Sequence, residues 1–204
     1  MVKKVLSINY SDTNGISGIQ KDLVTFQEQN VFGFTAITKL LINSNHTKEI
    51  IETYPSSLLK NQLESVLAGG EMDAVKIGHF NDLNDLEVIL SFIQQKKFKQ
   101  IVLDVSFVKD NSNLFKEIQS KLMPTINALV ITPTLLAQLT GETATASPKS
   151  LDSMARKLLT DTLKYILISL NPDDNLHAIV THDSLTKKKF AKHDAATILT
   201  AKLA

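Results

Sequence analysis

Short runs of β-branched and aliphatic residues alternate with stretches of helical periodicity along the whole chain. The first run is Val5–Asn9, and a later one is Ala74–Ile77. Between such runs, apolar residues recur every three or four positions, as they do in Leu86, Ile89, Leu90 and Ile93. Parallel strands need a crossover helix between them, so this alternation is typical of a parallel sheet covered by helices.

The same alternation predicts most of the secondary structure. Expected strands are Val5–Asn9, Val31–Thr38, Ala74–Ile77, Gln100–Val105, Ala128–Thr132, Tyr165–Ser169 and His177–Thr181. Expected helices cover Ile19–Asn30, Ser56–Leu67, Leu86–Ile93, Leu114–Leu122, Pro133–Gly141, Pro148–Leu158 and about Asp194 to the end. We therefore expect an α/β fold and a single domain over residues 1–204. Its architecture would be a three-layer α/β/α sandwich with a mainly parallel central sheet, in which Leu6, Ile8, Val102 and Leu103 are buried.

Composition excludes several classes of protein. The chain has 204 residues, 43% of them hydrophobic, which is enough for one sizeable core. Its net charge is +1, and its longest basic run, Lys187–Lys189, is typical of a solvated turn or edge strand, so we expect no nucleic-acid partner. The apolar start at Val5–Ile8 is too short for a signal peptide or membrane span. The absence of cysteine rules out disulfides and thiolate metal sites, and it fits a cytoplasmic protein.

The loops that follow the strands are the expected place for a ligand, because an open parallel sheet gathers its helix N-termini there. Residues predicted to lie in these loops are Tyr10, Ser11, Asp12, Asn43, His79, Asp104 and Thr134. Structural roles are open for several polar candidates. Asp22 could be a helix-surface charge, Asn43 a loop residue, Asp104 a capping carboxylate and His79 a structural or rim histidine.

One segment carries a specific resemblance. Tyr10–Thr38 begins YSDTNGISGIQKDL and is similar to the opening of the pyridoxal and hydroxymethylpyrimidine kinases of the ribokinase-like superfamily. In that family a Gly-Ser/Thr-Asp turn leads into Gly-Ile-Gln-x-Asp-Leu and a Thr-Phe helix. The resemblance continues, in the family's order and spacing, through Asp73–Phe80, Ile101–Val105 and Ile131–Thr134.

The resemblance implies an ATP-dependent kinase that phosphorylates the hydroxymethyl group of a vitamin precursor, namely pyridoxal, pyridoxine or hydroxymethylpyrimidine. Mg-ATP is the implied cofactor, and a homodimer is a possible assembly because relatives are commonly dimers. The implied substrate-binding positions are Tyr10, Asp22, Asn43 and His79. The implied catalytic positions are Asp104, near the phosphates and metal, and Thr197, at the catalytic base; the implied nucleotide-binding positions are Thr134, Ala195 and Ala196.

The family's anion-binding turn is altered in this chain. Family members use Gly-x-Gly-Cys or Gly-x-Gly-Asp at the start of a late helix, and the best match here is His193–Ala201. Both glycines are absent, and Asp194 stands where the phosphate would bind. Thr197 occupies the base position, but a threonine hydroxyl has no useful acidity near neutral pH. An alternative alignment places this segment on a later helix, in which case the motif is absent.

The residues at the family's metal-binding and vitamin-binding positions differ in this chain as well. The family's Asn-x-x-Glu becomes Thr134 and Ala137, and alanine offers Mg²⁺ no ligand, so we expect no metal-binding residue there. Tyr10 replaces a glycine of the hydroxymethylpyrimidine kinases, and its ring is expected to fill the vitamin pocket. Family members continue with helices that wall the adenine pocket, whereas this chain ends soon after Ala201, so we expect a short C-terminal end.

Three functions remain open. The first is a pseudokinase that has lost activity and binds ATP poorly, which the combined losses favour. The second is an active pyridoxal or phosphomethylpyrimidine kinase with a rearranged site. The third is a non-catalytic scaffold or binding subunit.

Overall fold

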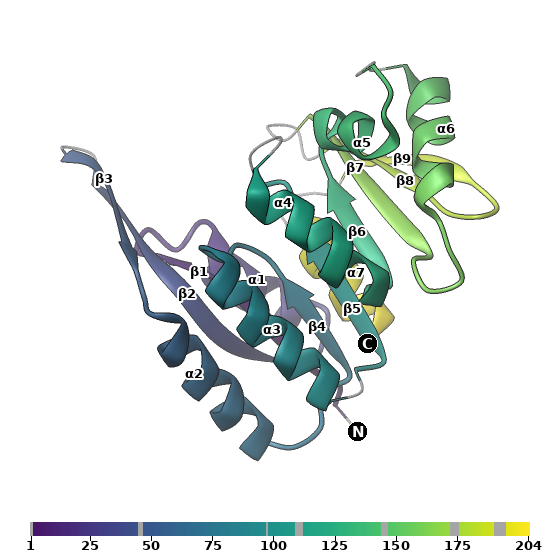
Figure 1. Ribbon diagram of the computed structural model, residues 1–204. Coiled ribbons are helices and arrows are strands. Elements are labelled where there is room, and N and C mark those ends of the chain that lie inside the picture. The colour runs from purple at the N-terminus through teal and green to yellow at the C-terminus, as the bar shows by residue number, and fades with distance from the viewer. Residues whose placement is uncertain are drawn as a thin grey trace. The chain divides into compact units, whose positions relative to one another are not determined.

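The computed structural model describes residues 2–44, 47–96, 98–108, 112–143, 147–171, 176–189 and 195–204. Two compact units make up the chain (Figure 1). The first unit combines Met1–Gln100 with Thr197–Ala204, and the second comprises Ile101–Ala196. The single domain expected over residues 1–204 stays a prediction, and each unit is described by itself.

The first unit is built on a sheet of strand order β3-β2-β1-β4. Its strands are β1 (Lys4–Asp12), β2 (Phe32–Ser44), β3 (Thr47–Thr53) and β4 (Ala74–Ile77). Its helices are α1 (Gly18–Glu28), α2 (Ser56–Ala68), α3 (Leu83–Gln95) and most of α7 (Ala195–Leu203). β1 is parallel to both β2 and β4, whereas β3 is antiparallel to β2.

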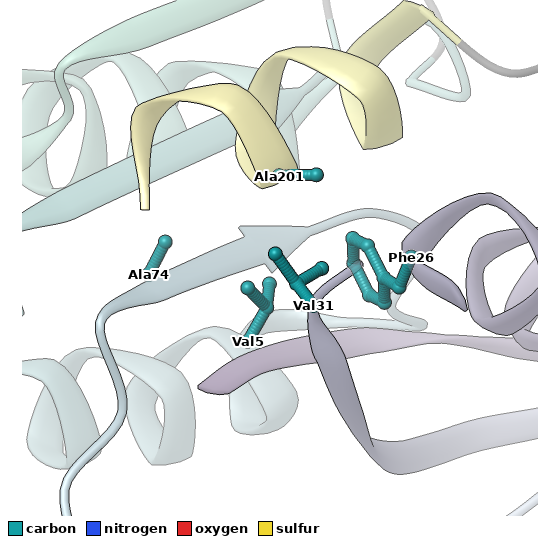
Figure 2. Packing of buried hydrophobic residues seen from close by; sticks show 5 residues of the cluster. All are labelled: Val5, Phe26, Val31, Ala74 and Ala201. Atoms are coloured by element: carbon teal, nitrogen blue, oxygen red, sulfur yellow. The ribbon is translucent and has the colours of Figure 1, made fainter. Parts of the chain in front are cut away.

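Helices cover both faces of this sheet. A side chain at Gly33 of β2 would meet Phe26 of α1, while the ring of neighbouring Phe34 lies close to Gly69 at the end of α2. Since successive strand residues point to opposite faces, α1 and α2 lie on opposite sides of the sheet. On the α1 side, α7 completes a buried cluster (Figure 2) whose members are Val5, Phe26, Val31, Ala74 and Ala201. The first unit therefore has the three layers expected from the sequence.

The second unit has strand order β5-β6-β7-β8-β9. Its strands are β5 (Gln100–Asp104), β6 (Ala128–Ile131), β7 (Tyr165–Asn171), β8 (Leu176–Val180) and β9 (Leu185–Lys189). Its helices are α4 (Asn113–Glu117), α5 (Pro133–Thr140) and α6 (Pro148–Leu158). β5, β6 and β7 run parallel, and β8 and β9 continue antiparallel. The α/β class with a mainly parallel sheet is confirmed.

The predicted core is confirmed, since Leu6, Ile8, Val102 and Leu103 are all 0% exposed. Fully burying such a side chain contributes about 1.5–3 kcal/mol relative to leaving it exposed. Several element boundaries differ from the prediction: β1 and β2 extend further than expected, and β3 was not predicted. Across the described ranges, no helix is long and apolar enough to cross a membrane.

One predicted helix, Leu114–Leu122, consists of two different helical segments. α4 ends at Glu117, and the next turn, Ile118–Leu122, is a π-helix, which leads into a short 3₁₀ turn that contains Pro124. Proline has no backbone N–H to continue an α-helix, so the helical path ends there, as the sequence indicated.

Candidate active site

Asp22 of α1 lies at the centre of a buried polar network in the first unit. The side chain is 1% exposed, and its carboxylate accepts four hydrogen bonds. The donors are Ser7 Oγ at 2.5 Å and Asn9 Nδ2 at 3.1 Å to Oδ2, and Lys76 Nζ at 2.7 Å and Thr197 Oγ1 at 2.5 Å to Oδ1. A carboxylate has about four acceptor positions. All of them are therefore used within the protein, and they join α1 to β1, β4 and α7.

Lys76 supplies the positive charge of this network. It lies in β4 and is 1% exposed, and its ammonium donates to Asp22 Oδ1 at 2.7 Å and to Thr197 Oγ1 at 2.8 Å. A buried charge is costly unless it is both paired and hydrogen-bonded. The pair Asp22–Lys76 meets both conditions, so each of the two charges depends on the other.

Thr197 completes the network from α7, at the position expected for the catalytic base. Its side chain is 0% exposed. The hydroxyl donates its hydrogen to Asp22 Oδ1 and accepts a hydrogen bond from Lys76 Nζ. An ammonium donor on its oxygen makes the hydroxyl a still poorer proton acceptor than threonine is in water, so the side chain cannot act as a general base in this arrangement.

Asn9 connects the network to the carboxyl ends of β1 and β4. Its Nδ2 donates to Asp22, while its Oδ1 accepts from the backbone N–H groups of Tyr10 at 3.0 Å and His79 at 3.1 Å. Gly78 leaves room for this amide, because a Cβ there would lie 2.9 Å from the Asn9 side chain. These contacts fix Tyr10 and His79 beside each other.

The rings of Tyr10 and His79 meet edge to face, with centroids 5.0 Å apart and planes at 65°. Burial raises the pKa of Tyr10, and a hydrogen bond to Ser17 partly offsets this effect. Burial lowers the pKa of His79 to about 3, and the charges of Lys39 and Lys76 add to the effect. The His79 imidazole is therefore neutral near pH 7 and presents an uncharged aromatic ring to Tyr10.

The turn between β1 and α1 is held by side chains of the quoted motif. Asp12 is 1% exposed; its Oδ2 accepts from Ser17 Oγ at 2.5 Å, and its backbone N–H donates to Gln20 Oε1 at 2.9 Å. Gly18 has a φ of 61°, and a Cβ there would collide with the carbonyl of Tyr10. The glycine thus allows the start of α1 to lie close against the end of β1.

The remaining described candidates lie in the second unit. Asp104 Oδ1 accepts from the backbone N–H of Ser106 at 2.9 Å and from its hydroxyl at 2.5 Å. The carboxylate thus has the capping role that was the structural alternative for Asp104. On α5, Thr134 is exposed, and the methyl group of Ala137 is 3% exposed.

Other predicted positions are only partly described. Asn43 lies in β2 rather than in a loop, but its side chain is outside the described residues, as is Asp194. Ala195 begins α7, and the methyl group of Ala196 is 1% exposed. Within the described ranges, no three His, Asp or Glu side chains gather closely enough to hold a metal ion.

Sequence reasoning missed three members of the network: Ser7, Asn9 and Lys76. Ser7 and Asn9 alternate with Leu6 and Ile8 in a strand that is buried on both faces, and Lys76 interrupts the apolar run of β4. Polar side chains in such strands need buried partners, and this pattern could have pointed to them.

Solved structures with this fold include two vitamin kinases. The pyridoxal kinase from Staphylococcus aureus in complex with pyridoxal aligns with a TM-score of 0.84 and 22% identity, over 100% of this chain and 80% of that one. The phosphomethylpyrimidine kinase from Clostridium difficile 630 aligns with a TM-score of 0.82 and 20% identity, over 98% and 90%. At these identities the likeness establishes the class of fold, which is that of the pyridoxal and phosphomethylpyrimidine kinases.

Sequence relatives place the chain more closely. Pyridoxine kinase from Bacillus subtilis is 31% identical over 176 residues, and hydroxymethylpyrimidine/phosphomethylpyrimidine kinase from Haemophilus influenzae is 33% identical over 189. These alignments cover 81% and 86% of this chain but 64% and 68% of the relatives. The profile of the phosphomethylpyrimidine kinase family matches residues 12–202. The chain belongs to this family and spans about two thirds of the length of these two relatives.

Proposed function

We propose that this chain is a pseudokinase, which keeps the fold of a kinase for pyridoxal, pyridoxine or hydroxymethylpyrimidine but does not transfer a phosphoryl group. The observation that carries the proposal is the state of Thr197. Its hydroxyl is fully buried between Asp22 and Lys76, at the position where the family has a carboxylate or thiolate base.

The state of Asp22 supports the same conclusion at the vitamin end. A substrate that donates a hydrogen bond to this carboxylate must displace one of its four donors, and two of these are a buried ammonium and the Thr197 hydroxyl. Displacing either leaves a buried group poorly satisfied, which costs about 1–3 kcal/mol or more. We therefore propose that Asp22 is a structural link between α1, β4 and α7.

The missing groups would also slow phosphoryl transfer strongly. A missing general base costs about 10²–10⁴ in rate, and a missing preorganised anion donor costs about 10²–10³. These losses need not multiply, because groups that act as a unit overlap in what they supply. Either loss alone is enough to bring turnover far below that of an ordinary kinase.

The residues present do not fit Mg-ATP. Asp104 uses one oxygen on its own turn, Ala137 offers no metal ligand, and the methyl group of Ala196 stands where the family has a bare glycine backbone. A pyridoxal kinase of Staphylococcus aureus has been solved in complex with AMP-PCP. For the present chain we propose weak binding of Mg-ATP.

The proposal extends to location and partners. A chain without cysteine and with a net charge of +1 fits the cytoplasm and gives no basis for a nucleic-acid partner. A vitamin precursor is a possible small-molecule partner, and we expect it to bind weakly or not at all. A homodimer is a possible assembly.

An ADP-release assay tests the proposal. The full chain is incubated with Mg-ATP and each of pyridoxal, pyridoxine and hydroxymethylpyrimidine, with the Bacillus subtilis pyridoxine kinase as the positive control. We expect no ADP release above background, and no thermal shift on titration with Mg-ATP. Turnover within about tenfold of an ordinary kinase, abolished by Asp104→Asn, would show that the chain is an active kinase with a rearranged site.

A further inference from the structure

A cavity lies at the amino ends of the strands of the first unit. Its volume is about 540 Å³, within the range of about 300–1,000 Å³ that small-molecule sites occupy. Four segments line it: the start of β1, the end of α2, the loop before β4 and the loop between α3 and β5. The lining residues that matter here are Lys4, Met72, Asp73, Lys96, Phe98 and Lys99.

This cavity is separate from the candidate active site. Lys4 begins β1, whereas Tyr10 lies near its other end. A strand rises about 3.3 Å per residue, so the two residues are about 20 Å apart. None of Asp22, Asn9 and Thr197 lines the cavity.

Hydrogen bonds give the cavity a fixed wall. The backbone N–H of Lys4 donates to Asp73 Oδ2 at 3.0 Å, and the backbone N–H of Asp73 donates to the Lys4 carbonyl at 2.8 Å. Asp73 Oδ1 accepts from Lys99 at 3.0 Å and from Lys3 at 3.4 Å. The bond from the Lys4 backbone and then that from Lys99 lower the pKa of Asp73 to about 2. The Asp73 carboxylate is thus charged and already neutralised by lysines.

The net charge of the cavity lining favours a ligand with a single negative charge. Among the described residues, the lysines at and beside it are Lys3, Lys4, Lys96 and Lys99, and the carboxylates are Glu71 and Asp73, which leaves a net charge of +2. The C-terminal ends of α2 and α3 also meet here, and each contributes about −0.5 of a charge. A net charge of about +1 remains and would be neutralised by one carboxylate.

Helix capping accounts for only part of this lysine cluster. Lys4 Nζ donates to the Gly69 carbonyl at 2.9 Å, so this lysine caps the end of α2. Lys96 follows α3, and among the described residues its ammonium makes no ion pair or hydrogen bond. Its three donors are therefore available to a ligand at the mouth of the cavity.

The rest of the wall is apolar. Met72 is 7% exposed, and the half-buried ring of Phe98 is held against Phe92, with centroids 5.3 Å apart. An aromatic ring and a thioether suit a flat apolar body. We propose that this cavity binds a small organic monoanion, with a planar apolar body against Phe98 and Met72 and a carboxylate between Lys96 and Lys99.

Titration of the full chain with 4-fluorobenzoate, followed by ¹⁹F NMR at low ionic strength, tests this proposal. A ligand of this size is expected to reach a Kd of about 1 mM. The neutral analogue 4-fluorobenzamide should bind about tenfold more weakly, because it lacks the charge-assisted bonds. Added salt should weaken the benzoate only. Equal binding of the two compounds, or no saturation by benzoate, overturns the proposal.

Variants locate the site. Lys96→Gln should weaken benzoate binding about fivefold or more without disturbing the fold, since this side chain has no partner to lose among the described residues. Lys187→Gln, a change at an exposed position on β9, is the matched control and should bind as the unmodified chain does. Backbone amide shifts should appear at Gly70 and Met72. Shifts at Gly18 and Gly78 instead, or an unchanged Kd in Lys96→Gln, would refute the site.

Discussion

Replacing Lys76 with methionine tests whether the buried network holds the first unit together. Methionine has a similar length, so the substitution removes the ammonium and its hydrogen bonds to Asp22 and Thr197 with little change of volume. Asp22 keeps the donors Ser7, Asn9 and Thr197 but loses its only counter-charge in this network. Removing one partner of a buried ion pair costs about 3–5 kcal/mol. We expect a loss of this size in the free energy of unfolding.

Urea denaturation followed by circular dichroism at pH 7 measures this loss. The matched control is Lys60→Met, because the Lys60–Glu64 pair is 3.9 Å apart and its side chains are 64% and 63% exposed. An exposed pair of this kind contributes at most about 1 kcal/mol. The control should therefore unfold at nearly the same urea concentration as the unmodified chain.

A double variant separates the ion pair from general damage to the core. Asp22→Leu combined with Lys76→Met removes both charges, so it should cost less than the sum of the two single substitutions by about 1 kcal/mol or more. The reasoning is wrong if Lys76→Met costs no more than Lys60→Met, or if the two substitutions at the pair are simply additive.

Three further predictions concern other parts of the chain. If the Tyr10 ring fills the vitamin pocket, calorimetry should detect pyridoxal binding to Tyr10→Gly but not to the unmodified chain, and tight binding to the latter contradicts the blocked pocket. The pKa of His79 falls from 6.5 to about 3 on folding, so between these pH values the unfolded chain binds a proton that the folded chain does not. Stability should consequently rise with pH through this window, and His79→Gln should flatten that slope; an equal slope in both proteins rejects the assignment. Leu103→Asp places a carboxylate at a site that is 0% exposed and should abolish cooperative unfolding, whereas a normal thermal transition would show that β5 tolerates the charge.

The parts of the fold that the sequence predicted well are those with a buried face. β4 was predicted as Ala74–Ile77 and has those bounds, because all four of its residues are buried. β3 gave no comparable pattern. Its Ile50 and Ile51 are adjacent rather than alternating, and they are 45% and 51% exposed. A strand without a buried face does not show the alternation of apolar and polar residues that identifies a strand in a sequence. β3 is therefore defined by its pairing with β2.

The candidate site was predictable only in part. The motif that resembles the kinases drew attention to Tyr10 and Asp22, which stand close together in sequence. The partners of Asp22 come from positions 7, 9, 76 and 197, and no local pattern states that these side chains meet. The four donors to the Asp22 carboxylate are brought together by tertiary contacts. The filling of its acceptor positions can therefore be seen only in the structure.

The network also gives a physical reason for a threonine, rather than any small residue, at position 197. Alanine there would leave Asp22 without one donor and Lys76 without one acceptor, both at less than 3% side-chain exposure. Each unsatisfied buried group costs about 1–3 kcal/mol. Threonine supplies both bonds and adds no buried charge beside the pair. In the proposed pseudokinase, Thr197 does not serve as a base for phosphoryl transfer. Its hydrogen bonds to Asp22 and Lys76 still attach α7 to α1 and β4. Thr197→Ala should therefore lower the stability of the chain while Thr197→Ser preserves it, and a chain equally stable with alanine would remove this explanation.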